Sequence, residues 1–179
     1  PPQFWTHTTD KELKQISCVF FFLLLMSCAL WRNTALPSKL ETNTFLPLHC
    51  ALATATIVIF TSVFIVCWNA FDATRKKNNV ILAVAFLCAA ILGLFHAITF
   101  QGMPGFLDAI DMHKSLSFWL LSRYIVGITL FRFTIKLDES PISTKQSLGI
   151  LTLGLFLTSI VSWAIFHYPE VVPLTYLEG

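Results

Sequence analysis

The chain has 179 residues, of which 55% are hydrophobic and 12% are charged, and its mean hydropathy is +0.70. This composition excludes a soluble globular domain, because too little polar surface is available to cover the apolar side chains. The formal charge of +2 says little when it is averaged over a chain of this composition, and the positions of the charges matter more. We therefore expect the lipid bilayer, and no nucleic acid, to be the partner of this chain.

Five long apolar runs follow one another, each suited to a helix that crosses a bilayer. They cover residues 16–31, 46–71, 80–100, 116–136 and 148–168. No proline lies inside a run except Pro47, which we place in the first turn of the second helix, where its missing N–H costs nothing. The sequence predicts an all-α, polytopic transmembrane bundle of five spans over residues 16–168. Residues 1–15 and 169–179 would flank it on opposite sides of the membrane.

Lysine and arginine are unevenly divided between the segments that link these runs. If the N-terminus is cytoplasmic, eight basic residues lie inside and three lie outside. The inner residues are Lys11, Lys14, Arg75, Lys76, Lys77, Arg132, Lys136 and Lys145, and the outer ones are Arg32, Lys39 and Lys114. The positive-inside rule therefore predicts a cytoplasmic N-terminal segment, 1–15, and an extracytoplasmic C-terminal segment, 169–179.

Four of the five histidines then fall at the outer side of the bundle. On the third run, small residues recur every four positions and allow another helix to approach closely, which points the neighbouring His96 inward. The imidazoles are candidate ligand-binding residues in a pocket beneath the outer surface, or amphipathic residues at the level of the lipid headgroups. The histidines are His49, His96, His113 and His167, and the small residues are Ala85, Ala89, Gly93 and Ala97.

Arg123 lies seven residues inside the fourth run and four residues after Trp119. A guanidinium at this depth costs roughly 2.5–3.5 kcal/mol on insertion scales, so it needs a partner or water. We predict that Trp119 and Arg123 form part of the ligand site, with Arg123 as its positive floor. The alternative is an arginine side chain that extends to the outer surface. Candidate acidic partners are Glu41, Asp108, Asp111 and Glu178.

The identity of a cofactor stays open between haem and copper. Met103 and the four outer histidines form a candidate metal-ligand set, since thioether and imidazole groups suit copper. Two histidines at matching depth on different helices, such as His49 and His96, would suit a haem. The five cysteines form no CxxC pair and are interpreted as packing thiols. No catalytic motif is present, so we expect no enzyme activity.

A set of short motifs resembles the third class of bacterial membrane-associated sensor domains (MASE-type). They are His49, Trp68-Asn69, Asn79, Gly93, His96, Gly102-Met103, Trp119, Arg123 and TYLEG at 175–179. The resemblance implies the N-terminal membrane module of a histidine kinase or diguanylate cyclase in the bacterial inner membrane, followed by another helix and an output module. The family commonly has a glutamate four residues after the first histidine. Ala53 stands there in this chain, which removes a natural counter-ion for Arg123.

The leading functional hypothesis is a non-catalytic sensory module that binds a ligand at the outer leaflet and transmits a helix movement inward. The alternative is a subunit of a membrane redox complex, which either binds haem or copper or serves as an accessory. In both cases the chain could pack against other membrane proteins or form a homodimer.

Overall fold

The computed structural model describes residues 42–103, 112–135 and 140–168. Backbone contacts divide the chain into two units, Pro1–Phe45 and Leu46–Gly179, and the fold described below is that of the second. The predicted first span, 16–31, and the flanking segments 1–15 and 169–179 lie outside the described residues.

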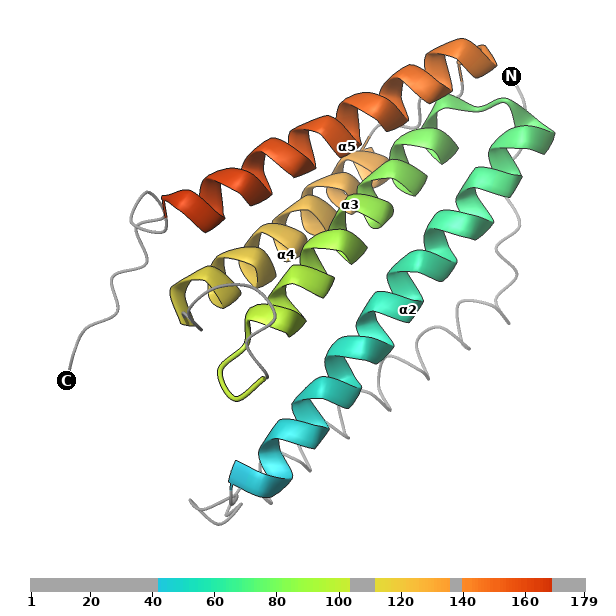
Figure 1. The fold of residues 1–179 in the computed structure, drawn as a ribbon. Coiled ribbons are helices and arrows are strands. Elements are labelled where there is room, and N and C mark those ends of the chain that lie inside the picture. The colour runs from blue at the N-terminus through green and yellow to red at the C-terminus, as the bar shows by residue number, and fades with distance from the viewer. Residues whose placement is uncertain (1–41, 104–111, 136–139, 169–179) are drawn as a thin grey trace, which may run out of the picture. The chain divides into compact units, whose positions relative to one another are not determined.

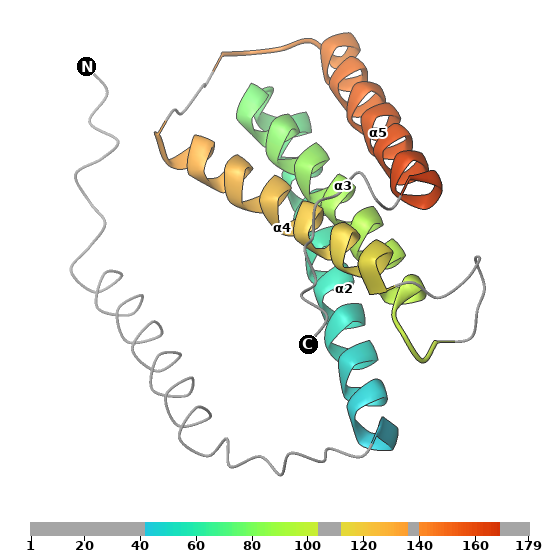
Figure 2. The same ribbon diagram turned by 90° about the vertical axis from the view of Figure 1, so that its left-hand side faces the viewer.

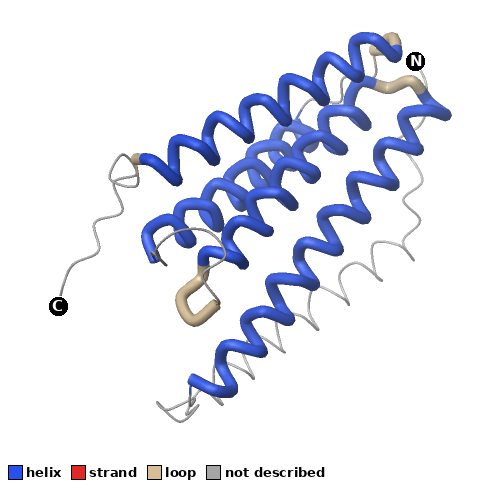
Figure 3. The backbone as a smooth tube through the Cα atoms, in the orientation of Figure 1, coloured by secondary structure: helices blue, strands red, loops and turns tan. Residues whose placement is uncertain are grey.

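Four helices make up the described part of the chain. They are α2 (Thr42–Thr74), α3 (Lys77–Thr99), α4 (Met112–Ile135) and α5 (Thr144–His167). Successive helices run in opposite directions (Figures 1 and 2). The described residues contain helices and loops but no strand (Figure 3), apart from one isolated bridge between Lys76 and Pro141. All four helices are long and apolar enough to cross a membrane, so the all-helical prediction is confirmed for the described part of the chain.

Each helix begins a few residues before the apolar run that predicted it. The first turn of a helix has backbone N–H groups without helical partners, so polar residues that can reach water or form a cap belong there. In α5, Ser143 and Gln146 form a reciprocal capping box: the Ser143 hydroxyl accepts from the Gln146 N–H, and the Gln146 side chain accepts from the Ser143 N–H.

In α2 the early start puts Pro47 inside the helix. Our placement of Pro47 in the first turn was wrong, and one backbone hydrogen bond is missing there.

Helix α3 carries most of the core, and the other three helices pack on it. One buried cluster joins α2 to α3, a second lies on the same two helices nearer their connection, and a third joins α3 to α4 and α5. Their members are Phe60, Phe86, Ala89 and Ala90; Phe71, Val80, Val84 and Cys88; and Leu92, Phe118 and Ile165. Large apolar side chains on the outer faces stay exposed, as expected where lipid replaces water.

Two glycines mark the close approaches of α3. A Cβ atom at Gly154 of α5 would lie 2.5 Å from Val84 Cγ1 and 3.4 Å from Cys88 Sγ, so α5 meets α3 at that level. A Cβ atom at Gly93 of α3 would lie 3.5 Å from Ile57 Cγ1 of α2. The predicted small-residue stripe therefore faces α2 at Gly93, and Gly154 of α5 has less room than Gly93.

The bundle has two chemically different ends. At the basic end, α2 passes into α3 and α5 begins. There the Arg75 side chain donates to Thr144 Oγ1 at 2.7 Å, the Ile142 N–H donates to the Arg75 carbonyl at 3.0 Å, and the Lys77 N–H donates to the Ser140 carbonyl at 3.1 Å. At the histidine end, α2 begins, α3 ends and α4 begins. The two basic segments that we predict to lie inside thus share one end, opposite His49 and His96.

Candidate ligand site at the histidine end

His49 and His96 come together although they belong to different helices. His49 lies in an early turn of α2 and His96 in the last turn of α3. Their ring centroids are 5.3 Å apart with an interplanar angle of 73°. Phe100, just after α3, stacks on His49 at 3.8 Å and 21° and lies 5.9 Å from His96. We call His49 and His96 the histidine pair.

Ser115, in the first turns of α4, determines the tautomer of His96. Nδ1 of His96 is 2.9 Å from both the carbonyl oxygen and Oγ of Ser115, and this Oγ donates to the His96 carbonyl at 3.1 Å. A carbonyl oxygen can only accept, so the proton resides on Nδ1. The neutral ring therefore presents the lone pair of Nε2, which is the arrangement that suits a metal ion or a hydrogen-bond donor.

The Ser115 contact also connects the helices mechanically. Ser115 is only 3% exposed, so its three polar contacts with His96 are shielded from competition. A second buried serine, Ser122, donates from Oγ to the Ala89 carbonyl at 3.0 Å. These contacts fix α4 against α3, and the ring contacts of His49 add α2. The site is therefore built from three helix ends.

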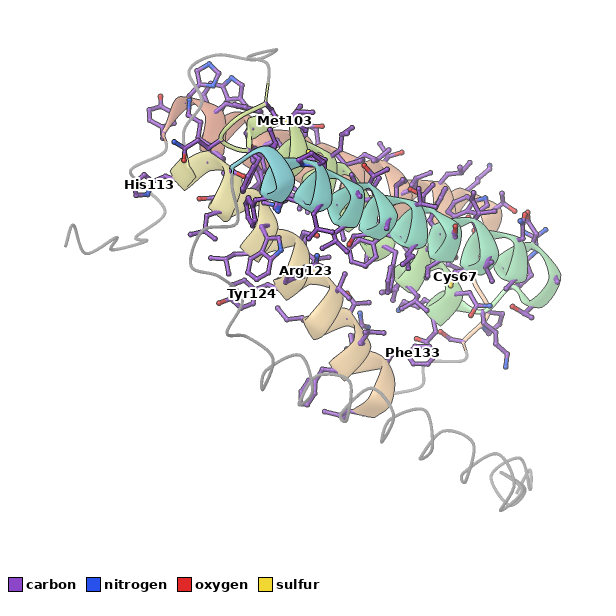
Figure 4. The ribbon with its side chains drawn as sticks, turned by 90° about the horizontal axis from the view of Figure 1, so that it is seen from below. Cys67, Met103, His113, Arg123, Tyr124 and Phe133 are labelled. Atoms are coloured by element: carbon purple, nitrogen blue, oxygen red, sulfur yellow. The ribbon has the colours of Figure 1, made fainter. Side chains whose placement is uncertain are left out.

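Two sulfur atoms lie at the same end. Cys50 follows His49 in α2, and its thiol is 3.7 Å from Sδ of Met103 in the loop after α3. This loop turns at Gly102, which has φ 97°, and a Cβ atom there would lie 3.3 Å from Leu46 Cδ2. Only glycine adopts this conformation readily. Figure 4 shows Met103 and His113 at the same end of the bundle.

The other predicted histidines have different surroundings. His113 is exposed at the start of α4, and its carbonyl accepts from Ser117 Oγ at 2.7 Å. His167 is exposed, stacks on Trp163 of its own helix at 4.5 Å, and donates from Nδ1 to the Trp163 carbonyl at 2.9 Å. In the described parts of the chain, no group of three or more His, Cys, Asp or Glu residues could hold a metal ion. The four histidines therefore do not form one ligand set.

Arg123 lies farther from the histidine end than Ser115 does, and its guanidinium contacts aromatic rings. Its guanidinium carbon is 5.5 Å from the ring centroid of Phe60 in α2 and 5.7 Å from that of Trp119 in α4. In Figure 4, Arg123 lies between α4 and α2. It follows Ser115 by eight residues, which is about 12 Å along a helix. The four acidic partners that we considered for Arg123 all lie outside the described residues.

Phe100 and Ser115 were missed as site residues. The signal for Ser115 is its spacing from Phe118 and Ser122, since positions three and seven residues apart share one helix face. All three are buried against α3. Phe100 carried no comparable signal, because it is one of 17 phenylalanines in the chain.

These features define a class of protein: an all-helical bundle whose described helices are long and apolar enough to cross a membrane. The model of the MASE3 family, the membrane-associated sensor domain, matches residues 40–179. The chain belongs to this family of membrane-associated sensor domains, which confirms the resemblance found in its motifs. No curated protein and no solved structure matches the chain.

Proposed function

We propose that the chain is a non-catalytic sensory module of the bacterial inner membrane whose ligand site at the outer leaflet contains the histidine pair. Membership in a sensor-domain family supports the sensory role. The observation that carries the site is the contact of His96 Nδ1 with the Ser115 carbonyl at 2.9 Å, because it orients a basic nitrogen where three helix ends meet.

The distribution of charge supports the orientation. Arg75, Lys76 and Lys77 lie at the basic end together with Lys145 in the first turn of α5. The positive-inside rule places this end in the cytoplasm and the histidine pair at the outer leaflet. Helix α2 then begins outside, so a preceding span at 16–31 would put the N-terminus in the cytoplasm and bring the number of spans to five.

A ligand at the histidine pair would act on the spacing of helices. His49 is carried by α2, whereas His96 and Ser115 belong to the tightly joined α3 and α4. A ligand bound to both imidazoles would favour one distance between α2 and the other two helices. Such a difference in affinity between two arrangements is what a sensor requires. The contact of Arg123 with Phe60 joins α4 to α2, so it would change when the distance between these helices changes.

The chemistry of the site favours a soft metal ion over a porphyrin. A haem ligated by both histidines would have to lie between their rings, but these meet edge to face at 5.3 Å and Phe100 covers a face of His49. The two imidazoles, with the Met103 thioether at the same end of the bundle, are ligand types that Cu⁺ accepts. We therefore choose Cu⁺ as the first probe.

We expect Cu⁺ to raise the unfolding temperature of the chain in lipid nanodiscs. At about 100 times the dissociation constant, binding adds about 2.7 kcal/mol to the stability of a folded protein. Thermal unfolding with and without Cu⁺, and with haemin as a second probe, measures the effect. The shift with Cu⁺ should disappear in His96→Ala and His49→Ala and weaken in Ser115→Ala.

His167→Ala is the matched control, because His167 is also an outer-end histidine but contacts only Trp163 among the interactions described above. It should keep the full Cu⁺ shift. Loss of the shift in His167→Ala together with its survival in His96→Ala would contradict the proposed site. A larger shift with haemin than with Cu⁺ would contradict the choice of ligand.

A further inference from the structure

The guanidinium of Arg123 has no anionic partner in the described part of the chain. Its central carbon is 5.5 Å from the ring centroid of Phe60 and 5.7 Å from that of Trp119. Among the described residues, no hydrogen-bond acceptor and no carboxylate contacts it. Ring faces attract the positive charge, but they leave the five N–H donors of the guanidinium without oxygen acceptors. Arg123 is an exposed residue, so a molecule in the lipid can reach its side chain.

The depth of Arg123 separates it from the lipid headgroups. It lies ten positions from each end of the candidate span His113–Phe133, which is about 15 Å of helix. This distance is half of the hydrocarbon thickness of about 30 Å. Phe60 lies near the middle of the candidate span of α2, Phe45–Thr74, so its contact with the guanidinium keeps the charge near mid-depth. A charged side chain at this depth calls for an opposite charge.

The face of α4 that continues from Arg123 has room for an apolar chain. On the side of the histidine end, Trp119 contacts the guanidinium. On the other side, Gly127 follows four residues later on the same helix face, and a Cβ atom there would have no heavy atom within 4 Å. Leu130 and Phe131 continue this face and are 45% and 68% exposed. The guanidinium therefore lies at one end of an open apolar surface that runs toward the basic end.

We propose that Arg123 binds the carboxylate of a fatty acid from the lipid phase, whose chain lies along α4 over Gly127. A guanidinium pairs with a carboxylate through two parallel N–H···O bonds. The charge of Arg123 selects an anion, its depth excludes the phosphate of a lipid headgroup, and the open face at Gly127 suits an apolar chain. Arg123 follows Ser115 by eight residues, about 12 Å of helix. This site is thus separate from the histidine pair, and binding there goes beyond the proposed function.

Quenching of tryptophan fluorescence tests the proposal, because Trp119 lies beside the guanidinium. The chain in phosphatidylcholine nanodiscs is titrated with stearic acid that carries a doxyl quencher on its fifth carbon. We expect saturable quenching that unlabelled stearate reverses, whereas the uncharged methyl ester of the same probe should not saturate. Arg123→Leu should weaken binding about tenfold to a hundredfold, the usual effect of losing a hydrogen bond to a charged group. Gly127→Leu, which puts a side chain in the path of the apolar chain, should also weaken it.

Arg123→Lys keeps the charge without the planar guanidinium and should bind with intermediate affinity. A thermal unfolding curve of each variant shows that it is folded. Arg132→Leu is the matched control, because Arg132 is an exposed arginine of the same helix near the basic end. This variant and His96→Ala should bind the probe like the wild type, so the test is independent of the Cu⁺ experiment.

Three outcomes would overturn the proposal. Equal, saturable quenching by the acid and its methyl ester would show that the charge plays no part. An unchanged affinity in Arg123→Leu would place the fatty acid elsewhere. Cross-linking of Gly127→Cys to a second chain, with no effect of the fatty acid, would assign this face of α4 to a homodimer.

Discussion

Substitution of Gly154 by valine is expected to destabilise the bundle by about 1–3 kcal/mol, the usual cost of overpacking a well-packed interior. Even a single Cβ atom at this position would lie 2.5 Å from Val84 Cγ1 and 3.4 Å from Cys88 Sγ. Helix α5 would have to move away from α3. Unfolding of the purified chain by increasing amounts of sodium dodecyl sulfate, followed by circular dichroism, measures the loss.

Gly149→Val is the control within the same helix, because a Cβ atom at Gly149 has no heavy atom within 4 Å. It should change stability much less. Val84→Ala removes the atom closest to the new side chain and should restore part of the stability of Gly154→Val. Equal effects of the two glycine substitutions would show that helix propensity, and not the contact between α3 and α5, is responsible.

Arg123→Leu is expected to weaken the bundle by about 1–2 kcal/mol and to reduce the Cu⁺ shift, whereas Arg132→Leu has little effect. Arg123 contacts the rings of Phe60 and Trp119, and each cation–π contact contributes about 0.5–2 kcal/mol, depending on desolvation. Since Phe60 belongs to α2, the substitution loosens α2 from α4. Arg132 is exposed in the last turn of α4, near the basic end, and its long side chain can reach the lipid headgroups.

The same unfolding assay measures both arginine variants, and Arg123→Lys tests geometry at constant charge. Lysine should retain part of the stability, because an ammonium group also binds aromatic faces but lacks the planar shape of guanidinium. Mild and equal losses in Arg123→Leu and Arg132→Leu would favour the alternative from the sequence, in which Arg123 merely extends to the membrane surface.

The helical bundle was predictable because few structures other than helices satisfy the backbone inside lipid. Apolar runs therefore located α2 to α5 with little ambiguity. They did not locate the helix ends, because the first turns carry polar residues such as Lys77 and Gln146 that look like loop residues. For the same reason Pro47 was assigned to a first turn, although α2 begins before it.

The candidate site was predictable only in part. Charge asymmetry predicted that His49 and His96 lie at the same end, but contact between them depends on the rotation of α2 and α3, which the sequence pattern determines poorly. The partner of His96 comes from a third helix, and the spacing of Ser115 from Phe118 and Ser122 indicates only a buried face of α4, not a contact with His96. Arg123 was recognised from its depth, whereas its position over Phe60 follows from the packing of α2 against α4.

The contacts at the basic end restrict how the helices can move. Arg75, at the corner between α2 and α3, has the left-handed φ of 57°. Its side chain donates to Thr144 Oγ1 in the first turn of α5, and its carbonyl accepts from the Ile142 N–H just before that helix. The cytoplasmic ends of these three helices are therefore fastened together in the proposed orientation, while their outer ends are held by separate contacts. If a ligand at the histidine pair moves the histidine ends of these helices, as we propose, we expect the helices to tilt about Arg75, so that their basic ends change in angle more than in position.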